Sequence, residues 1–600
     1  MLDVLKEIEN EIAFRFPNGT EFVKSDSFAV YENKVCYRNG ADIFRAALRV
    51  KSGIVGDKKY TEPDRFDDLC FFVDCTRNAV PTVGTVKKII RIAALLGYNA
   101  VMLYMENTFE TNNEPVFGYM CGRYTKAELK EMDSYAVKVG MELIPAVQTL
   151  AHFERLKRWY KEYDEHFDCG DILMPDDKRV ETLLENIFDT LSECFTSRRV
   201  HIGMDEAHML GRGRYYDVHG ARPMFDLFMS HLNKVASMAE RRGLSCIMWG
   251  DMFCGIAKSK SGESNASPRI STDVTARMPK NTEVSHWCYE AGGDRYLERY
   301  ELYKAFGKPT WMALSVHKCL DFLPMNRYAE HEYDAAFDAL AKFPFMRRLI
   351  NCAWSDNGGE CSVFASLPAM TAFICKAYGL PHAVGDRLFY ALTDIEYDDF
   401  CKIEYANTLC DAVTEDYASP SKMFLYNDVL CGQFDCEVMP EYRNAFQAAK
   451  EENEKLAKSK YGILFENAAA YADVLIRKFD MGLRVRKAYS DGDKIELKRV
   501  ADEIPSVVAA IDEFLGTLRK RWFFENKPQG FEIQELRLGG VKERLSGVRQ
   551  RLIDYVNGIA ANIPELEEPV LDDVYFGRNK KTGRLQWSSF ALTVSVNSIS

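Results

Sequence analysis

From about residue 67 onward, short apolar runs alternate with longer segments whose apolar residues recur every three or four positions. The runs are nearly continuous in apolar character, which is typical of strands in a parallel sheet buried on both faces. Eight such runs occur, at residues 69–75, 99–105, 141–147, 198–204, 244–250, 283–289, 309–315 and 347–354. The pattern therefore predicts eight parallel strands joined by helices.

The segments between the runs have the period of amphipathic helices, as at residues 85–97, 125–140, 177–195 and 224–243. Several end at a glycine, which is a common helix stop signal. Eight strand and helix units between about residues 69 and 380 predict an α/β fold of the (β/α)8 TIM-barrel type. An open doubly wound sheet is the rival topology, but it usually has a glycine-rich loop after its first strand. The corresponding residues here, VDCTRNAVP, contain no glycine.

The two ends of the chain follow other patterns. Residues 1–66 contain short mixed pieces, which predict a small N-terminal α/β segment before the barrel at 67–380. From 381 to 600 the period is helical almost throughout, which predicts a separate C-terminal α-helical domain. Residues 574–596 regain a two-residue alternation, and this predicts a terminal hairpin.

Composition and charge narrow the function classes. The formal net charge is -12 with both signs mixed along the chain, which argues against nucleic acid or an anionic membrane surface as the main partner. The N-terminus lacks the pattern of a secretion signal. The sequence contains no run of about 18 apolar residues, which is the length that a membrane-spanning helix needs. The 17 cysteines include no CxxC pair, as expected of thiols in a reducing compartment. We therefore expect a cytoplasmic protein with a small polar or neutral substrate.

Candidate chemistry gathers where the predicted strands end, because the loops at the C-terminal face of a barrel build its site. These positions hold Asp74, Arg77, Glu106, Asn107, His152, Asp205, Glu206, Trp249, Asp251, Trp287, Tyr289, Trp311, Trp354, Asp356, Asn357 and Glu360. Tryptophan rings among carboxylates and an arginine are typical of a sugar pocket, where flat rings pack on the apolar face of a pyranose.

One short motif gives this pocket a family resemblance. Residues 201–206, HIGMDE, resemble the His-Ile-Gly-Gly-Asp-Glu signature of glycoside hydrolase family 20, the β-N-acetylhexosaminidases. Asp74 and Arg77 are similar to the Asp-x-x-Arg of the family's first strand, and His152 stands where the family has Met-Pro-Gly-His. The family's three aromatic positions on strands five, six and eight are taken by Trp249, Trp287 and Trp354. The resemblance covers the barrel, roughly half of the chain.

The resemblance implies a use for two adjacent carboxylates. An ordinary retaining glycosidase holds its two carboxyl groups about 5 Å apart on opposite sides of the anomeric carbon, which neighbours at one strand end cannot easily do. Family 20 instead uses the 2-acetamido oxygen of the substrate as nucleophile. By this resemblance Glu206 is the general acid and base, while Asp205 accepts the acetamido N–H and stabilises the oxazolinium intermediate.

The same resemblance implies the binding residues. Arg77 is expected to hold the ring hydroxyls, with Asp356 or Glu360 opposite it. The remaining substrate-binding positions are His152, Trp249, Trp287, Tyr289, Trp311 and Trp354. The predicted function is an exo-acting β-N-acetylhexosaminidase that removes terminal N-acetylglucosamine or N-acetylgalactosamine from small glycans.

Several positions depart from the family pattern. Met204 replaces the second glycine of the signature, Asn107 or its neighbour replaces the aspartate of strand two, and Gln148 replaces the aspartate of strand three. Glu106 is a candidate acidic partner for His152. Strand seven has no clear counterpart of the tyrosine that clamps the acetamido oxygen, and Tyr289 is the expected substitute.

Two other classes fit parts of the pattern. A metal-dependent barrel hydrolase or isomerase could use His201, Asp205, Glu206 and His208, but the first strand has no His-x-His pair. A non-catalytic sugar-binding barrel would keep the tryptophans without needing a paired acid. We expect no metal and no cofactor, and the sequence leaves the oligomeric state open.

Overall fold

The computed structural model describes residues 2–254, 270, 272–290, 292–307, 309–411 and 420–570. Eight strands form a closed barrel in the order β10-β11-β12-β13-β4-β5-β6-β9, and neighbouring strands are parallel. The strands are β4 (Asp68–Asp74), β5 (Ala100–Tyr104), β6 (Glu142–Ala146), β9 (Arg199–His201), β10 (Ser245–Trp249), β11 (Thr282–Trp287), β12 (Thr310–Ser315) and β13 (Arg348–Ala353). The predicted (β/α)8 barrel is confirmed, strand for strand.

Side chains alternate between the two faces of each barrel strand, as the two-residue period of a strand requires. Cys70 and Phe72 of β4 point inward, into a core that also holds Met102, Tyr104 and Trp249. The alternate residues of β4 pack outward in the larger core shared with the helices. The interior is therefore a filled layer of side chains beneath the C-terminal mouth.

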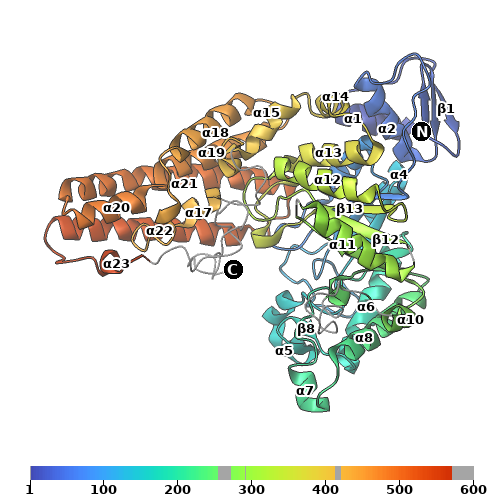
Figure 1. Cartoon of the computed structure of the whole chain (residues 1–600), viewed down its shortest axis with the longest axis horizontal. Coiled ribbons are helices and arrows are strands. Elements are labelled where there is room, and N and C mark those ends of the chain that lie inside the picture. Colours follow the sequence, from blue (N-terminus) through green and yellow to red (C-terminus); the bar gives the residue numbers. More distant parts are fainter. Residues whose placement is uncertain are drawn as a thin grey trace.

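Helices surround the barrel (Figure 1). They are α3 (Val83–Leu96), α4 (Lys126–Val139), α6 (Lys178–Cys194), α7 (Arg214–His219), α8 (Met224–Glu240), α10 (Thr272–Arg277), α11 (Gly293–Tyr303), α12 (Asn326–Leu340) and α13 (Leu367–Tyr378). Gly97 and Gly140 end α3 and α4 in the left-handed region, as the glycine stop signals predicted.

Short elements fill the barrel loops. The long loop after β6 contains η1 (Glu154–Trp159), α5 (Tyr160–Tyr163), η2 (Asp164–His166), β7 (Phe167–Cys169) and β8 (Ile172–Leu173). Further 3-10 turns are η3 (Lys304–Phe306), η4 (Asp356–Gly358), η5 (Val363–Ser366), η6 (Lys402–Glu404) and η7 (Asp435–Glu437).

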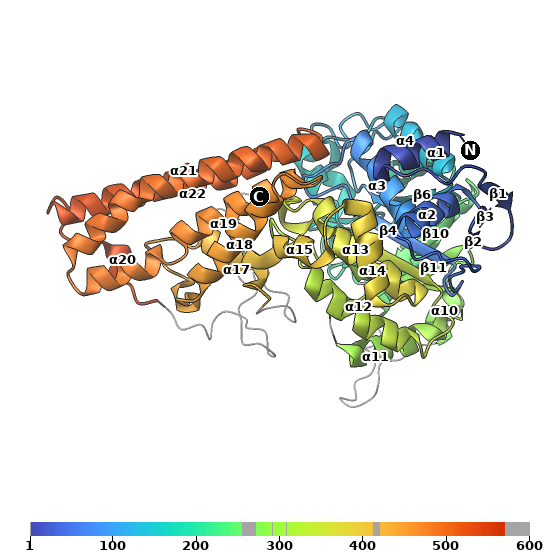
Figure 2. The ribbon, with the colours of Figure 1, turned by 90° about the horizontal axis from the view of Figure 1, so that it is seen from above.

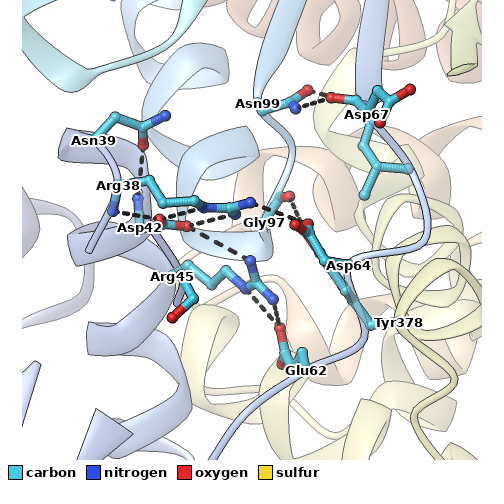
Figure 3. A network of polar contacts seen from close by, with 12 residues as sticks. Arg38, Asn39, Asp42, Arg45, Glu62, Asp64, Asp67, Gly97, Asn99 and Tyr378 are labelled. Atoms are coloured by element: carbon cyan, nitrogen blue, oxygen red, sulfur yellow. Dashed lines mark hydrogen bonds and ion pairs between the residues drawn. The ribbon is translucent and has the colours of Figure 1, made fainter. Parts of the chain in front are cut away.

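A buried ion pair network lies within the N-terminal segment and contacts a barrel helix. The segment consists of α1 (Leu2–Ile12), β1 (Glu21–Lys24), β2 (Ala29–Tyr31), β3 (Lys34–Tyr37) and α2 (Gly40–Lys51), with strand order β1-β3-β2. Arg45 of α2 donates to Glu62 (Figure 3). Arg49 of α2 donates to the same carboxylate, and Arg45 also lies over the ring of Tyr378 in α13. Burial alone would raise the pKa of Glu62, but the two guanidinium charges lower it to about 2.

The C-terminal helices form an elongated arm beside the barrel (Figure 2). The helices after the barrel are α14 (His382–Thr393), α15 (Tyr397–Cys401), α16 (Tyr405–Thr408), α17 (Pro420–Tyr426), α18 (Tyr442–Leu456), α19 (Gly462–Lys478), α20 (Met481–Ser490), α21 (Lys494–Glu525), α22 (Phe531–Val556) and α23 (Pro564–Glu567). The first of them, α14, packs against α2 of the N-terminal segment. The predicted terminal hairpin at 574–596 lies outside the described residues. The division of the chain into domains at 1–66, 67–380 and 381–600 remains a proposal.

A buried charge cluster fastens the arm to the barrel. Glu360, in the loop after β13, pairs with Lys422 of α17 and, at 3.0 Å, with Arg537 of α22. All three side chains are nearly inaccessible to solvent. Glu360 therefore holds the arm in place, and the prediction that it binds substrate opposite Arg77 is wrong, because its carboxylate is already committed to two cations.

The arm returns to the mouth of the barrel between α21 and α22. The backbone N–H of Thr82 donates to Glu525 O at 3.0 Å, and the N–H of Lys527 donates to Val80 O at 2.8 Å. Lys527 also pairs with Glu128 at 2.8 Å. Among the described residues, no helix has the length and apolar character needed to cross a membrane.

Candidate active site

The loops at the C-terminal face contain an unusual number of non-glycine residues in the left-handed backbone region. Such residues follow six barrel strands: Arg77 (φ 47°), Glu106 (φ 38°), His152 (φ 63°), Glu206 (φ 54°), His317 (φ 49°) and Asn357 (φ 62°). This conformation costs on the order of 1 kcal/mol or more at each non-glycine residue and is found where function requires it. The concentration at one face marks that face as the candidate site.

The loop after β9 separates the two adjacent carboxylates. Gly203 (φ 66°) lies so close to Gln148 that a Cβ would stand 1.9 Å from its Oε1, so only glycine fits. Met204 and Glu206 also have positive φ angles. The resulting turn buries Asp205, whereas the side chain of Glu206 is 51% exposed. The pair consists of one buried carboxylate and one that faces the open pocket.

Asp205 is held as a charged group. Its Oδ1 accepts a hydrogen bond from Gln148 Nε2 at 2.8 Å, and its Oδ2 lies 3.1 Å from His152 Nε2. Burial alone would raise the pKa of Asp205, but the hydrogen bond and charge of His152, together with Gln148, keep it below its ordinary value. We infer that this carboxylate stays ionised at neutral pH.

His152 links the two carboxylates of the signature. Its Nε2 lies 3.1 Å from Asp205 and 3.7 Å from Glu206 Oε2. Burial would lower the pKa of His152, but the hydrogen bond and charge of Asp205, with the charge of Glu106, raise it to about 9. The direct acidic partner of His152 is therefore Asp205. The expected partner, Glu106, contributes through its charge and is bonded to Arg77.

Asp251, after β10, supports Glu206 from behind. Its Oδ2 accepts the backbone N–H of Glu206 at 3.0 Å. Burial, and then the nearby negative charge of Asp205, raises the pKa of Asp251 to about 7. The sequence placed Asp251 at a strand end without assigning it a role. The structure gives it one, since it fixes the strained backbone that presents Glu206.

A hydrogen-bond chain connects the two sides of the pocket. Gln148 Nε2 also donates to Tyr104 OH at 2.8 Å, and Tyr104 OH donates to Glu106 Oε1 at 2.9 Å. Glu106 pairs with Arg77, whose Nε lies 3.4 Å from Asp356 Oδ1. Arg77 and Asp356 therefore meet as the sequence predicted, on the side of the pocket away from Asp205.

Arg77, Asp205 and Glu206 line a cavity of about 190 Å³ at the mouth of the barrel. At about 30 Å³ per water molecule, this volume accommodates one small ring. Trp287, Tyr289 and Trp354 form its aromatic wall. Trp354 Nε1 donates to Tyr289 OH at 2.7 Å, which fixes the tyrosine ring against the wall. The other lining residues are Tyr104, His152, Ser315, His317, Cys319 and Asp356.

Two predicted wall residues lie elsewhere. Trp249 is fully buried in the barrel core beneath the pocket, packed against Trp354 with ring centroids 6.0 Å apart. Trp311 is the second residue of β12, so it lies at the opposite end of the barrel. There its Nε1 donates to Glu283 at 2.7 Å and its ring contacts Arg199 and Arg348. Both predictions of direct substrate contact are wrong, because the side chains serve the core.

The strand-seven side of the pocket was missed from the sequence. Ser315, His317 and Cys319 line the cavity where the family has its tyrosine. The Nε2 of His317 pairs with Glu332 of α12, which is fully buried. The segment WMALSVHK contains no recognisable motif, and the left-handed φ of His317, which turns it toward the pocket, cannot be seen in the sequence.

The alternative metal cluster does not assemble. His201 is fully buried against Trp249, and its Nδ1 accepts the N–H of Gly203 at 3.2 Å. His208 is exposed on the surface. Within the described parts of the chain, no group of three or more histidine, cysteine, aspartate or glutamate side chains is arranged to hold a metal ion.

Comparisons with known families match both halves of the molecule. The catalytic-domain model of glycosyl hydrolase family 20 matches residues 100–295, which include His152, Asp205 and Glu206. The model of the glycoside hydrolase 20C C-terminal domain matches residues 398–585. The chain belongs to glycoside hydrolase family 20. Its barrel thus carries the catalytic domain of a family 20 glycoside hydrolase, followed by the C-terminal domain of the 20C type.

Individual relatives of this family 20 chain are distant. Human hexosaminidase D is 24% identical over 253 residues, covering 40% of this chain and 49% of the human protein. Bovine hexosaminidase D is 25% identical over 226 residues, covering 36% of this chain and 62% of the bovine protein. The matches thus span about half to three fifths of these relatives. A solved exo-β-N-acetylglucosaminidase of Vibrio harveyi in complex with N-acetylglucosamine has 13% identity and a TM-score of 0.47, covering 65% of this chain and 71% of the other.

Proposed function

We propose that the protein is an exo-acting β-N-acetylhexosaminidase that works by retaining, substrate-assisted hydrolysis. The observation that carries the proposal is the geometry of Asp205 and Glu206 at the end of β9. One carboxylate is buried and held ionised, and its neighbour faces a pocket of single-ring size. Two groups on one strand end are poorly placed to attack and protonate a glycosidic bond from opposite faces, which supports a nucleophile supplied by the substrate.

Asp205 is the group that supports positive charge. With its oxygens already fixed by Gln148 and His152, it is oriented before substrate arrives. It accepts the acetamido N–H and stabilises the oxazolinium that forms when the acetamido oxygen attacks the anomeric carbon. Preorganised charge of this kind acts most strongly in the transition state, because no reorientation is needed there.

Glu206 is the group that moves the proton. It protonates the leaving oxygen in the first step and accepts a proton from water in the second. The N–H of Glu206 is anchored by Asp251, which keeps the carboxyl group over the pocket. Tyr289 OH, on the aromatic wall, is proposed to bind the acetamido oxygen.

The opposite end of the pocket binds the ring. Arg77 and Asp356 form a charged pair able to hold ring hydroxyls. Trp287 and Trp354 supply the apolar surface for the pyranose. A cavity of about 190 Å³ with room for one ring supports exo action on a terminal N-acetylglucosamine or N-acetylgalactosamine.

The substrate class is a small glycan or glycoconjugate, and no cofactor enters the proposed chemistry. A cytoplasmic location is proposed from cysteine usage, since all 17 cysteines are free thiols.

The test is hydrolysis of 4-nitrophenyl N-acetyl-β-glucosaminide, its galactosaminide counterpart and plain 4-nitrophenyl β-glucoside. We expect the first two to be cleaved, the glucoside to be inert, and a thiazoline mimic of the oxazolinium to inhibit strongly. Glu206→Gln should lower kcat by about 10² to 10⁴. Glu240→Gln, at an exposed position ending α8, is the matched control and should not change kcat. Cleavage of the glucoside, or a 2-fluoro sugar trapped on a protein carboxylate, would overturn the proposal.

A further inference from the structure

A second hollow opens beside the sugar pocket. Its volume is about 510 Å³, and it shares Arg77 and His152 with the sugar pocket. The loop after β6 supplies one wall and the loop after β13 another, with Ile533 and Arg537 of α22 from the arm. A ligand that binds Arg77 in the sugar pocket therefore has open space beside it in the hollow.

The hollow has an excess of positive charge. Five arginine and lysine side chains line it, namely Arg77, Arg155, Lys157, Arg158 and Arg537, against the carboxylates of Glu106, Glu154 and Asp171. The charge of His152, which also lines it, is paired with Asp205. Two of these carboxylates are engaged already, since Glu106 pairs with Arg77 and Asp171 Oδ2 accepts the backbone N–H of His152 at 2.8 Å. Arg77 and Arg537 have their own partners in Asp356, Glu106 and Glu360. The remaining positive charge is carried by Arg155, Lys157 and Arg158, which lie in η1 of the loop after β6.

Arg155 is the central group of that loop. It is half-buried, yet within the described chain its guanidinium makes no hydrogen bond and no ion pair. Burial, with the charges of Arg158 and Arg77 added to it, lowers its pKa. A charge removed from water without a partner is unfavourable, and a ligand anion would relieve this cost. Lys157 and Arg158 lie exposed at the rim, where they would attract such an anion.

The position of the hollow identifies which part of a substrate would reach it. Asp205 and Glu206 line the sugar pocket and not the hollow, so the leaving group lies elsewhere. Arg77, which the proposed function assigns to the ring hydroxyls, stands at the junction. A group that enters the hollow is therefore attached to a hydroxyl of the terminal sugar itself.

We propose that the enzyme accepts, and prefers, a terminal N-acetylhexosamine that carries a sulfate or phosphate ester, with the ester bound by Arg155 in the hollow beside Arg77. A planar guanidinium matches the oxygens of either anion, and charge-assisted hydrogen bonds of this type are strong. The inference rests on the proposed function, because it deepens the specificity of the same site.

The experiment compares 4-nitrophenyl N-acetyl-β-glucosaminide with its 3-, 4- and 6-O-sulfate and phosphate esters. The quantity measured is the ratio of kcat/KM for each ester to kcat/KM for the unsubstituted sugar. We expect a ratio of about 10 or more for at least one ester, and the sulfate and phosphate arms identify the anion. Added NaCl should lower the ratio, because salt screens exposed charges such as those at the rim.

Variants test whether Arg155 is responsible. Arg155→Gln should lower the ratio by about 10- to 100-fold, the worth of a hydrogen bond to a charged group. Arg155→Lys should retain part of the preference. Arg158→Gln, at the exposed rim, should lower the ratio by a smaller factor and carries little risk to folding. Arg212→Gln removes an exposed arginine that lines neither cavity, and it should leave the ratio as in the wild type.

The outcomes separate the two proposals. Cleavage of the unsubstituted sugar with ester ratios at or below 1 would overturn the anion site and leave the proposed function standing. A preference that survives in Arg155→Gln and Arg158→Gln would overturn the assignment of the site to this hollow. If neither the unsubstituted sugar nor any ester is cleaved, the proposed function itself fails.

Discussion

Asp205→Asn should move the titration of His152 from alkaline to acidic pH. In the wild type, burial lowers the pKa of His152, but Asp205, with a further contribution from the charge of Glu106, raises it from an ordinary 6.5 to about 9. At about 1.4 kcal/mol per pKa unit, this difference corresponds to roughly 3 kcal/mol that favours the imidazolium, net of the opposing effect of burial. The side chain is only 18% exposed, so solvent screens little of it. In the variant the burial remains and the charge is gone, so the pKa should fall below 6.5.

The same linkage predicts a pH-dependent stability. A histidine whose pKa is raised on folding stabilises the folded state fully below its unfolded pKa of about 6.5, and this stabilisation is lost as the pH rises through the folded value. The unfolding free energy of the wild type should therefore exceed that of Asp205→Asn most below about pH 6. Above about pH 9 the contribution of His152 to this difference should be gone.

The assay is an NMR titration of histidine Cε1–H signals in selectively labelled protein, with His152→Gln to assign the resonance. His231, which is buried and hydrogen-bonded to Thr149 O at 2.7 Å, is an internal control and should titrate alike in both proteins. A wild-type pKa at or below 6.5 would refute the reasoning. A value that stays near 9 in Asp205→Asn would show that Glu106, and not Asp205, is the controlling charge.

Other predictions address the turn, the domain junction and the barrel floor. Gly203→Ala should lower kcat at least about 10-fold, because the new Cβ would stand 1.9 Å from Gln148 Oε1. Gly243→Ala is the control and should keep its activity, since a Cβ there meets nothing within 4 Å. Equal activity in both variants would contradict the close approach of Gly203 to Gln148. Glu360→Ala should lower the free energy of unfolding, measured in urea, by about 3–5 kcal/mol, because the buried cations Lys422 and Arg537 lose this carboxylate. A loss below about 1 kcal/mol would mean that the cluster is not buried in solution. Trp311→Leu should lower the melting temperature and leave KM unchanged, while Trp287→Leu should raise KM; a KM effect of Trp311→Leu would return that ring to the pocket.

The barrel was predictable because its strands are short, apolar and regularly spaced. Once the strands were counted, the rule that their C-terminal ends meet brought Arg77, His152, Asp205 and Asp356 together correctly, although they are far apart in sequence. Trp311 is the second residue of β12, and a residue at the start of a strand lies at the opposite face of the barrel from the loops that form the pocket. Trp249 is the last residue of β10 but points inward, a distinction that depends on strand register.

Other site features depend on packing that sequence patterns do not encode. Glu360 looked like a rim residue because its partners, Lys422 and Arg537, lie far along the chain in helices that had no predicted contact with the barrel. Arg155 stood in a loop with no motif, and its significance comes from what surrounds it and from the partner it lacks in the described chain. Backbone angles that turn side chains into the pocket are likewise set by tertiary contacts.

Because residues 525–527 of the arm contact the barrel mouth, we expect the helical region and the barrel to depend on each other for folding. The hydrogen bonds from Thr82 and Lys527, with the pair between Lys527 and Glu128, cross between segments more than 390 residues apart in sequence. A chain cut within the arm should hold together as two associated fragments. A barrel expressed without the arm should fold poorly, since the loop that begins α3 and the wall beside the sugar pocket would be incomplete. The two parts should therefore not be freely exchangeable: a change at residues 525–527 of the arm has to be compatible with the first loop of the barrel.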